Sequence, residues 1–249
     1  MIFPIFYRLF SRGIGTLFYA VSRIYIPVFL RSSVLKGFSK LTGINSEESE
    51  FPMEDYPTIN AFFTRGLKAE SRKIQKADIV SPVDGEILEF GQIQSCQLIQ
   101  AKGIGYSTQA LLGGQEGAEF ERGSFISIYL SPKDCHRIMA PSDGVISGHR
   151  LIRGHLFPVR QPYIGKFNGL YTQNERAIIW LKSADFRLAM VLVGAINVGK
   201  LEVRPYSPAT YKGDWIGTFH LGSTVVLCID RPVVFRCQKG PICIGDSLA

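Results

Sequence analysis

The sequence predicts an α+β fold in which N-terminal amphipathic helices precede a β-rich domain. Three observations predict it: a charged stripe opposes an apolar stripe at helical spacing near the N-terminus, β-rich runs recur from about residue 85 onward, and 25 glycines with 13 prolines indicate many turns. The chain is 46% hydrophobic and 20% charged, which is a globular composition and excludes a disordered protein.

The first expected element is a helix between Phe3 and Tyr25. At about 100° per residue, one stripe carries the basic residues and the opposite stripe carries bulky apolar ones, namely Arg8, Arg12 and Arg23 against Phe3, Phe6, Phe10, Leu17, Val21 and Ile24. Gly13, Gly15 and Pro27 weaken this helix. The longest uncharged stretch, 13–22, is shorter than the roughly 20 residues that cross a bilayer. The helix is therefore expected either to lie on a membrane or to pack on the protein's own core.

The charge distribution favours the membrane. Of the formal net charge of +7, residues 1–40 contribute +6, because they hold six basic residues and no acidic one. Basic residues beside aromatic ones suit an interfacial helix on anionic lipid. We therefore expect peripheral attachment to the cytoplasmic side of the cell membrane. The rest of the chain is nearly neutral, which argues against a nucleic-acid partner.

The five cysteines indicate reduced thiols. Their number is odd and no two form a C-x-x-C pair, so the sequence predicts neither a disulfide framework nor a zinc site, and no metal is expected.

A change of pattern divides the chain. The polar connector 45–50 is followed by 57–65, which predicts a turn and a short helix. We expect a membrane-associating helical segment at 1–60 and a β-rich domain at 61–249. Strands are predicted around five runs, 86–90, 125–130, 177–181, 189–193 and 224–229.

A weak internal echo allows two related β halves. The Pro-x-Asp-Gly turn at 82–85 returns at 141–144, and each copy enters a β-rich run. Chance recurrence of a common turn is the alternative.

Three local features carry candidate chemistry, while complete cofactor motifs are missing. Ser223 follows Gly222 directly before an apolar strand, His136 lies in a polar loop after a strand, and Asp84 lies in a turn from which it could orient an imidazole. Together they form a triad-like set, although each residue taken alone has an ordinary structural interpretation.

In these residues the chain resembles the phosphatidylserine decarboxylase proenzymes, which are pyruvoyl-dependent and membrane-associated. The likeness begins near residue 57. Its ordered pieces are 60–68, 81–85, 100–103, 106–107, 111–113, 130–137, 156–159, 174–176, 193–195, 197–199 and 221–224.

The resemblance implies a self-processing enzyme. Ser223 would attack the carbonyl of Gly222, and the chain would be cut into a β chain, 1–222, and an α chain, 223–249, which stay together as a heterodimer. A pyruvoyl group would replace Ser223 as the cofactor. It would condense with the amine of phosphatidylserine and accept the electrons that departing carbon dioxide leaves, which yields phosphatidylethanolamine. His136 and Asp84 would complete the catalytic set.

Two positions depart from the family pattern. Met139 stands where the family usually has a second histidine, which serves self-cleavage, and Trp215 stands where an acid is common. Either His136 serves both steps, or another imidazole such as His220 stands in, or maturation is slow or absent. The alternatives to the decarboxylase are thus an uncleaved relative that binds lipid or a partner, and a hydrolase that uses Ser223 directly.

Overall fold

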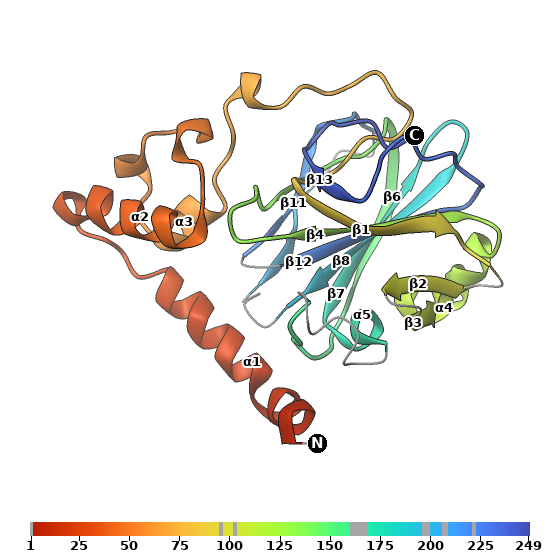
Figure 1. The fold of residues 1–249 in the computed structure, drawn as a ribbon, viewed down its shortest axis with the longest axis horizontal. Coiled ribbons are helices and arrows are strands. Elements are labelled where there is room, and N and C mark those ends of the chain that lie inside the picture. Colours follow the sequence, from red (N-terminus) through yellow and green to blue (C-terminus); the bar gives the residue numbers. More distant parts are fainter. Residues whose placement is uncertain are drawn as a thin grey trace.

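A computed structural model places three β-sheets, of eight, three and two strands in the described residues, beside a group of N-terminal helices (Figure 1). It describes residues 2–94, 97–101, 104–159, 169–195, 200–205, 209–220 and 223–249. The α-helices are α1 (Ile2–Ser22), α2 (Val28–Thr42), α3 (Ile59–Phe63), α4 (Thr108–Leu112) and α5 (Leu170–Gln173). The 3-10 helices are η1 (Ser46–Glu48), η2 (Met53–Asp55), η3 (Ala69–Ser71) and η4 (Gln115–Phe120). The strands are β1 (Gly85–Gln92), β2 (Gln97–Ala101), β3 (Ile104–Ser107), β4 (Ser124–Leu130), β5 (Arg137–Met139), β6 (Gly144–Ile152), β7 (Arg176–Lys182), β8 (Arg187–Gly194), β9 (Leu201–Val203), β10 (Ala209–Thr210), β11 (Trp215–Phe219), β12 (Ser223–Ile229) and β13 (Gly240–Ile242).

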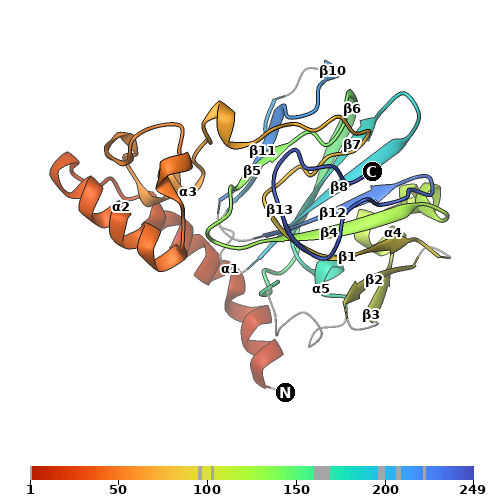
Figure 2. The same cartoon turned by 45° about the horizontal axis from the view of Figure 1, so that its top comes forward.

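The helices α1, α2 and α3 lie at one end of the molecule (Figure 2). The helix expected from Phe3 onward is confirmed as α1, and Gly13 and Gly15 lie inside it. Thr58 caps α3 by accepting a hydrogen bond from the N–H of Ala61, which explains why this short helix begins there. A small apolar core of its own fills the helical end, formed by Ile26, Leu35, Ile44, Tyr56, Phe62 and Phe63. Among the described residues, no helix has both the length and the apolarity to span a membrane.

The large sheet is antiparallel in all its described pairs, with the order β10-β6-β7-β8-β12-β4-β1-β13. The five predicted strands are confirmed as β1, β4, β7, β8 and β12. A small sheet, β5-β11-β9, shares one apolar core with the large sheet, because Ile138, Ile216 and Phe219 pack with Val225 and Leu227. The α+β prediction is therefore confirmed.

The two copies of the Pro-x-Asp-Gly turn occupy corresponding places. Gly85 begins β1 and Gly144 begins β6, and a Cβ on either glycine would lie within 2.5 Å of a carbonyl oxygen of the next strand inward, on Tyr129 or Lys182. Both pairs also shift register two to four residues after the glycine. This correspondence supports the two related β halves.

Candidate active site

Ser223 is the first residue of β12, one of the two central strands of the large sheet. Its Cα partners are Leu130 on β4 and Gly194 on β8, and it is fully buried. Successive side chains of a strand point to opposite faces, so Ser223 shares a face with Val225 and Leu227 in the core between the sheets. Gly222, the other half of the predicted cleavage junction, lies outside the described residues.

His136 lies immediately before β5, on the small sheet. Its carbonyl accepts a hydrogen bond from the N–H of Phe219 at 3.0 Å, so the small sheet holds this residue near the end of β11. Ile138 and Ala140 belong to the core between the sheets, and alternation directs His136 to the same side. The two sheets thereby direct Ser223 and His136 into one buried layer, although 87 residues separate them in the chain.

The surroundings of His136 keep its imidazole neutral, with one ring nitrogen able to accept a proton. Its Nδ1 lies 2.9 Å from the carbonyl oxygen of Asp134; a carbonyl only accepts, so Nδ1 carries the hydrogen and Nε2 keeps its lone pair. Burial lowers the pKa of His136 to about 3, and the positive charge of Arg65 acts in the same direction. The Phe63 ring of α3 packs on the imidazole, with 4.1 Å between ring centroids.

Two polar atoms in this layer stand out. Within the described part of the chain, neither Ser223 Oγ nor His136 Nε2 has a hydrogen-bond partner, and both are buried. Burying an unsatisfied polar atom costs about 1–3 kcal/mol, so such atoms are expected where chemistry needs them. A hydroxyl and a neutral imidazole can together perform nucleophilic attack with general-base assistance.

Asp84 makes a different set of contacts, with Arg72 and Ile244 rather than with His136. Its carboxylate accepts hydrogen bonds from Arg72 at 2.7 and 2.8 Å and from the N–H of Ile244 at 2.7 Å. It lines a cavity of about 380 Å³ together with Arg72 and Lys133. In the structure, the oxygen that faces the His136 imidazole is the Asp134 carbonyl, which no side-chain pattern in the sequence indicated. The predicted catalytic role of Asp84 stays a prediction.

His220 has both ring nitrogens occupied. Nδ1 lies 3.1 Å from Asn60 Oδ1 on α3, and Nε2 lies 3.2 Å from Glu202 Oε2 on β9. The Tyr19 ring of α1 packs edge-on against the imidazole. The role of His220 as an alternative base stays a prediction. The contacts with Asn60 and Glu202 leave neither ring nitrogen of His220 free for Ser223. Sequence patterns did not indicate Asn60 or Glu202, because neither lies near His220 in the chain.

The two departures from the family pattern are neighbours in space. Met139 on β5 and Trp215 on β11 are Cα partners in the small sheet. The guanidinium carbons of Arg137 and Arg204 lie 3.8 and 3.7 Å from the Trp215 ring centroid, so cations stack on the indole. A single patch of the small sheet therefore carries both changes.

Other candidate chemistry is sparse in the described residues. There, no group of three or more His, Cys, Asp or Glu side chains is arranged to hold a metal ion. The described cysteines, Cys135, Cys228, Cys237 and Cys243, are free thiols.

Comparison with known proteins finds relatives over most of the chain. The family model described as phosphatidylserine decarboxylase matches residues 59–247. A phosphatidylserine decarboxylase proenzyme of Myxococcus xanthus is 34% identical over 88% of this chain and 85% of its own length. The proenzymes of Nitrosococcus oceani and Verminephrobacter eiseniae are 38% and 36% identical, over 87% and 88% of this chain and 79% and 87% of their own lengths.

These matches cover the sheets that hold Ser223 and His136. The protein is an enzyme of the carboxy-lyase class. The chain belongs to the phosphatidylserine decarboxylase family, since both the family model and relatives above 30% identity span most of it.

Proposed function

We propose that this chain decarboxylates phosphatidylserine to phosphatidylethanolamine with a pyruvoyl group made from its own Ser223. One observation carries the proposal: Ser223 Oγ and His136 Nε2 are both buried and unpartnered among the described residues, and strand alternation directs both side chains toward the core between the sheets. A serine that must react with its own backbone fits such a buried place, because no outside substrate has to reach it before maturation.

Self-cleavage would run between Gly222 and Ser223. Nε2 of His136 takes the hydroxyl proton, and Oγ attacks the carbonyl carbon of Gly222; the C–N bond breaks and the proton passes to the nitrogen of Ser223, so that an ester replaces the amide. Elimination then removes the Cα proton of Ser223, breaks its Cβ–Oγ bond and releases the carboxylate of Gly222, and the resulting enamine becomes an imine. Water then replaces the nitrogen, ammonia leaves, and the keto group remains at position 223. The Asp134 carbonyl keeps the hydrogen of His136 on Nδ1 throughout.

The residues present fit the group that this reaction makes. The pyruvoyl group supplies an electron sink for the carbanion left by carbon dioxide. Around it, the apolar core excludes water, since Ser223, His136 and Leu130 are fully buried. His136 is again the imidazole on this face of the sheet that can hold a proton at Nε2.

The two products of cleavage are expected to stay together as a heterodimer. Residues 223–249 contain β12, whose seven residues pair with both β4 and β8 and are all buried. They also contain β13, which pairs with β1. Separating the chains would expose the centre of the large sheet, so association needs no further contact.

Mass spectrometry of the purified protein tests this function. Under denaturing conditions we expect the fragments 1–222 and 223–249, the latter with a pyruvoyl in place of an amino terminus. Under native conditions both should elute as one species that releases carbon dioxide from phosphatidylserine. An intact 27.7 kDa chain without activity would instead support the uncleaved lipid-binding relative.

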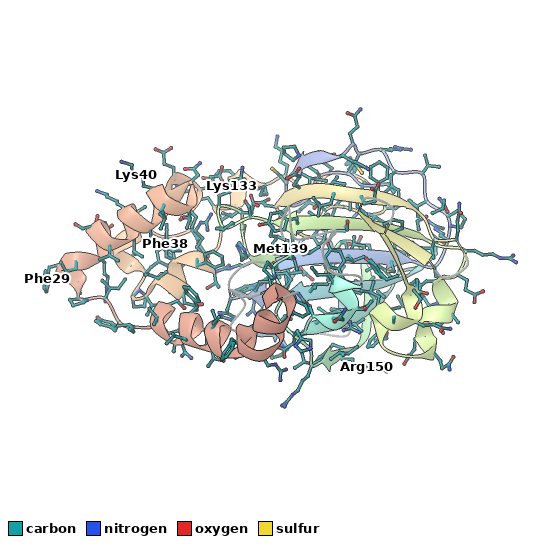
Figure 3. All side chains as sticks on the ribbon, turned by 60° about the horizontal axis from the view of Figure 1, so that its bottom comes forward. Phe29, Phe38, Lys40, Lys133, Met139 and Arg150 are labelled. Atoms are coloured by element: carbon teal, nitrogen blue, oxygen red, sulfur yellow. The ribbon has the colours of Figure 1, made fainter. Side chains whose placement is uncertain are left out.

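We also propose that α1 and α2 rest on an anionic membrane surface, at the cytoplasmic side of the cell membrane. Large apolar side chains are exposed along both helices, including Phe10, Leu17, Phe18, Val21, Ile24, Val28 and Phe29. Figure 3 shows Phe29 at the helical end of the molecule, away from the sheets. Part of the basic stripe of α1 still faces the protein, because Arg12 pairs with Glu175 at 2.9 Å.

Replacing Phe29 by serine tests the membrane proposal. The side chain is 83% exposed, so its loss should leave the fold unchanged and weaken binding to anionic vesicles several-fold. Val234, 84% exposed in the C-terminal tail, is the matched control, and its change to serine should leave co-sedimentation with vesicles unchanged. Equal binding of both variants and the parent protein would overturn the proposal.

A further inference from the structure

A charged cluster lies between α1 and the strand end that leads to Ser223. His220 follows β11 and stands three residues before Ser223, and its side chain is only slightly exposed. Glu202 and Lys200 come from β9 and the residue before it, with 3.8 Å between Lys200 Nζ and Glu202 Oε2. Tyr19 and Arg23 come from α1 and its end.

The cluster carries more positive than negative charge. Lys200 and Arg23 are cations, while among the described residues Glu202 is the single carboxylate that contacts His220. The guanidinium of Arg23 lies over the Tyr19 ring at 5.4 Å and donates to its hydroxyl at 3.4 Å, and in the described residues it pairs with no carboxylate. Burial lowers the pKa of His220, against the effect of Glu202, and the charges of Lys200 and Arg23 lower it further, so both cations act on the imidazole.

The position of the cluster connects the membrane side with the reacting residue. Ile24 and Tyr25, directly after Arg23, are exposed apolar side chains of the proposed membrane face. On the other side, the N–H of His220 donates to the carbonyl of Lys200, which holds the chain close to the point where β12 begins. The contact between Tyr19 and His220 therefore joins the end of α1 to the segment that leads to position 223.

We propose that Arg23 and Lys200, held around the His220–Glu202 pair, bind the phosphate of the phosphatidylserine head group. The inference rests on the proposed function and names the residues that hold the substrate. A phosphodiester anion suits these two cations, because Arg23 pairs with no carboxylate in the described residues and Lys200 shares Glu202 with His220. Charge-assisted hydrogen bonds to phosphate are among the stronger polar contacts. Asn60 and Glu202 act as positioning residues, because they hold the imidazole of His220 beside the two cations.

Steady-state kinetics in mixed micelles of phosphatidylserine and a nonionic detergent test the subsite. For the mature double variant Arg23→Gln/Lys200→Gln, we expect KM, expressed as mole fraction of lipid, to rise about tenfold, which corresponds to about 1.4 kcal/mol. The value of kcat should stay within about twofold, and the fraction of cleaved chain should equal that of the parent. Soluble glycerophosphoserine should inhibit the parent at about tenfold lower concentration than the variant.

A matched variant separates this subsite from general attraction to anionic surfaces. Lys76→Gln/Lys182→Gln removes the same charge from exposed residues outside α1 and α2 and should leave KM unchanged. An equal rise of KM in both double variants, or no rise in either, would overturn the subsite. Inhibition of the parent by inorganic phosphate as strong as by glycerophosphoserine would also overturn it, since the site would then bind free phosphate. A parent protein that stays uncleaved and inactive would instead refute the proposed function.

Discussion

Replacing Ser223 by alanine is expected to leave a single chain and to abolish decarboxylation completely. The hydroxyl is both the nucleophile that attacks Gly222 and the source of the keto group, so no slower route to the cofactor remains. The change removes one buried, unpartnered oxygen and should not reduce stability. Denaturing mass spectrometry should show the intact 27.7 kDa polypeptide, and carbon dioxide release should fall to background.

Ser127→Ala is the matched control for this loss. Ser127 is buried on the adjacent strand β4, and its change removes a hydroxyl of the same kind away from the cleavage junction. This variant should be cut and active like the parent. Any fragment 223–249, or any turnover above background, in the Ser223→Ala protein would show that another residue forms the cofactor.

Replacing His136 by glutamine is expected to slow self-cleavage at least about 100-fold and to leave the cleaved fraction inactive. Glutamine can keep a hydrogen bond to the Asp134 carbonyl but cannot accept a proton, and general-base assistance contributes roughly 100- to 10,000-fold. The rate of appearance of fragment 223–249 after expression in a short pulse measures the first effect. Decarboxylation per pyruvoyl group measures the second.

The pH profile identifies the imidazole that acts. Because burial lowers the pKa of His136 to about 3, its base form persists from pH 6 to pH 8 and cleavage in the parent should show no imidazole titration in that range. His149→Gln, on the exposed side of β6, should cleave like the parent at each pH. A titration near the ordinary histidine pKa that disappears in a His220→Gln variant would assign the base to His220 instead.

The sequence identified the elements and predicted the reacting serine. The amphipathic stripe of α1, the short apolar runs of β4, β8 and β12, and the turns at Gly85 and Gly144 are local patterns, and local hydrogen bonding realises them without reference to distant residues. The Gly-Ser-Thr junction and the loop with His136 were also recognisable, because their motifs are contiguous.

The sequence did not predict which groups contact the imidazoles of His136 and His220. Asp84 was a reasonable partner for His136 by residue type, yet the structure places its oxygens on Arg72 and Ile244 and a backbone carbonyl on the ring. Every residue has a backbone carbonyl, so residue identity does not indicate which carbonyl will accept a hydrogen bond. The pairing of Met139 with Trp215 depends likewise on the register between β5 and β11.

By itself, the sequence determined the helices, the strands and the family and predicted the serine at the cleavage junction, since each depends on residues close together in the chain. Only the tertiary structure decided that β12 is one of the two central strands, that His136 and Ser223 are both fully buried, and that Asn60 and Glu202 contact the ring of His220. Those facts depend on which strands pair and which faces of the sheets meet. Such choices are made by the summed burial of many distant side chains rather than by any local pattern.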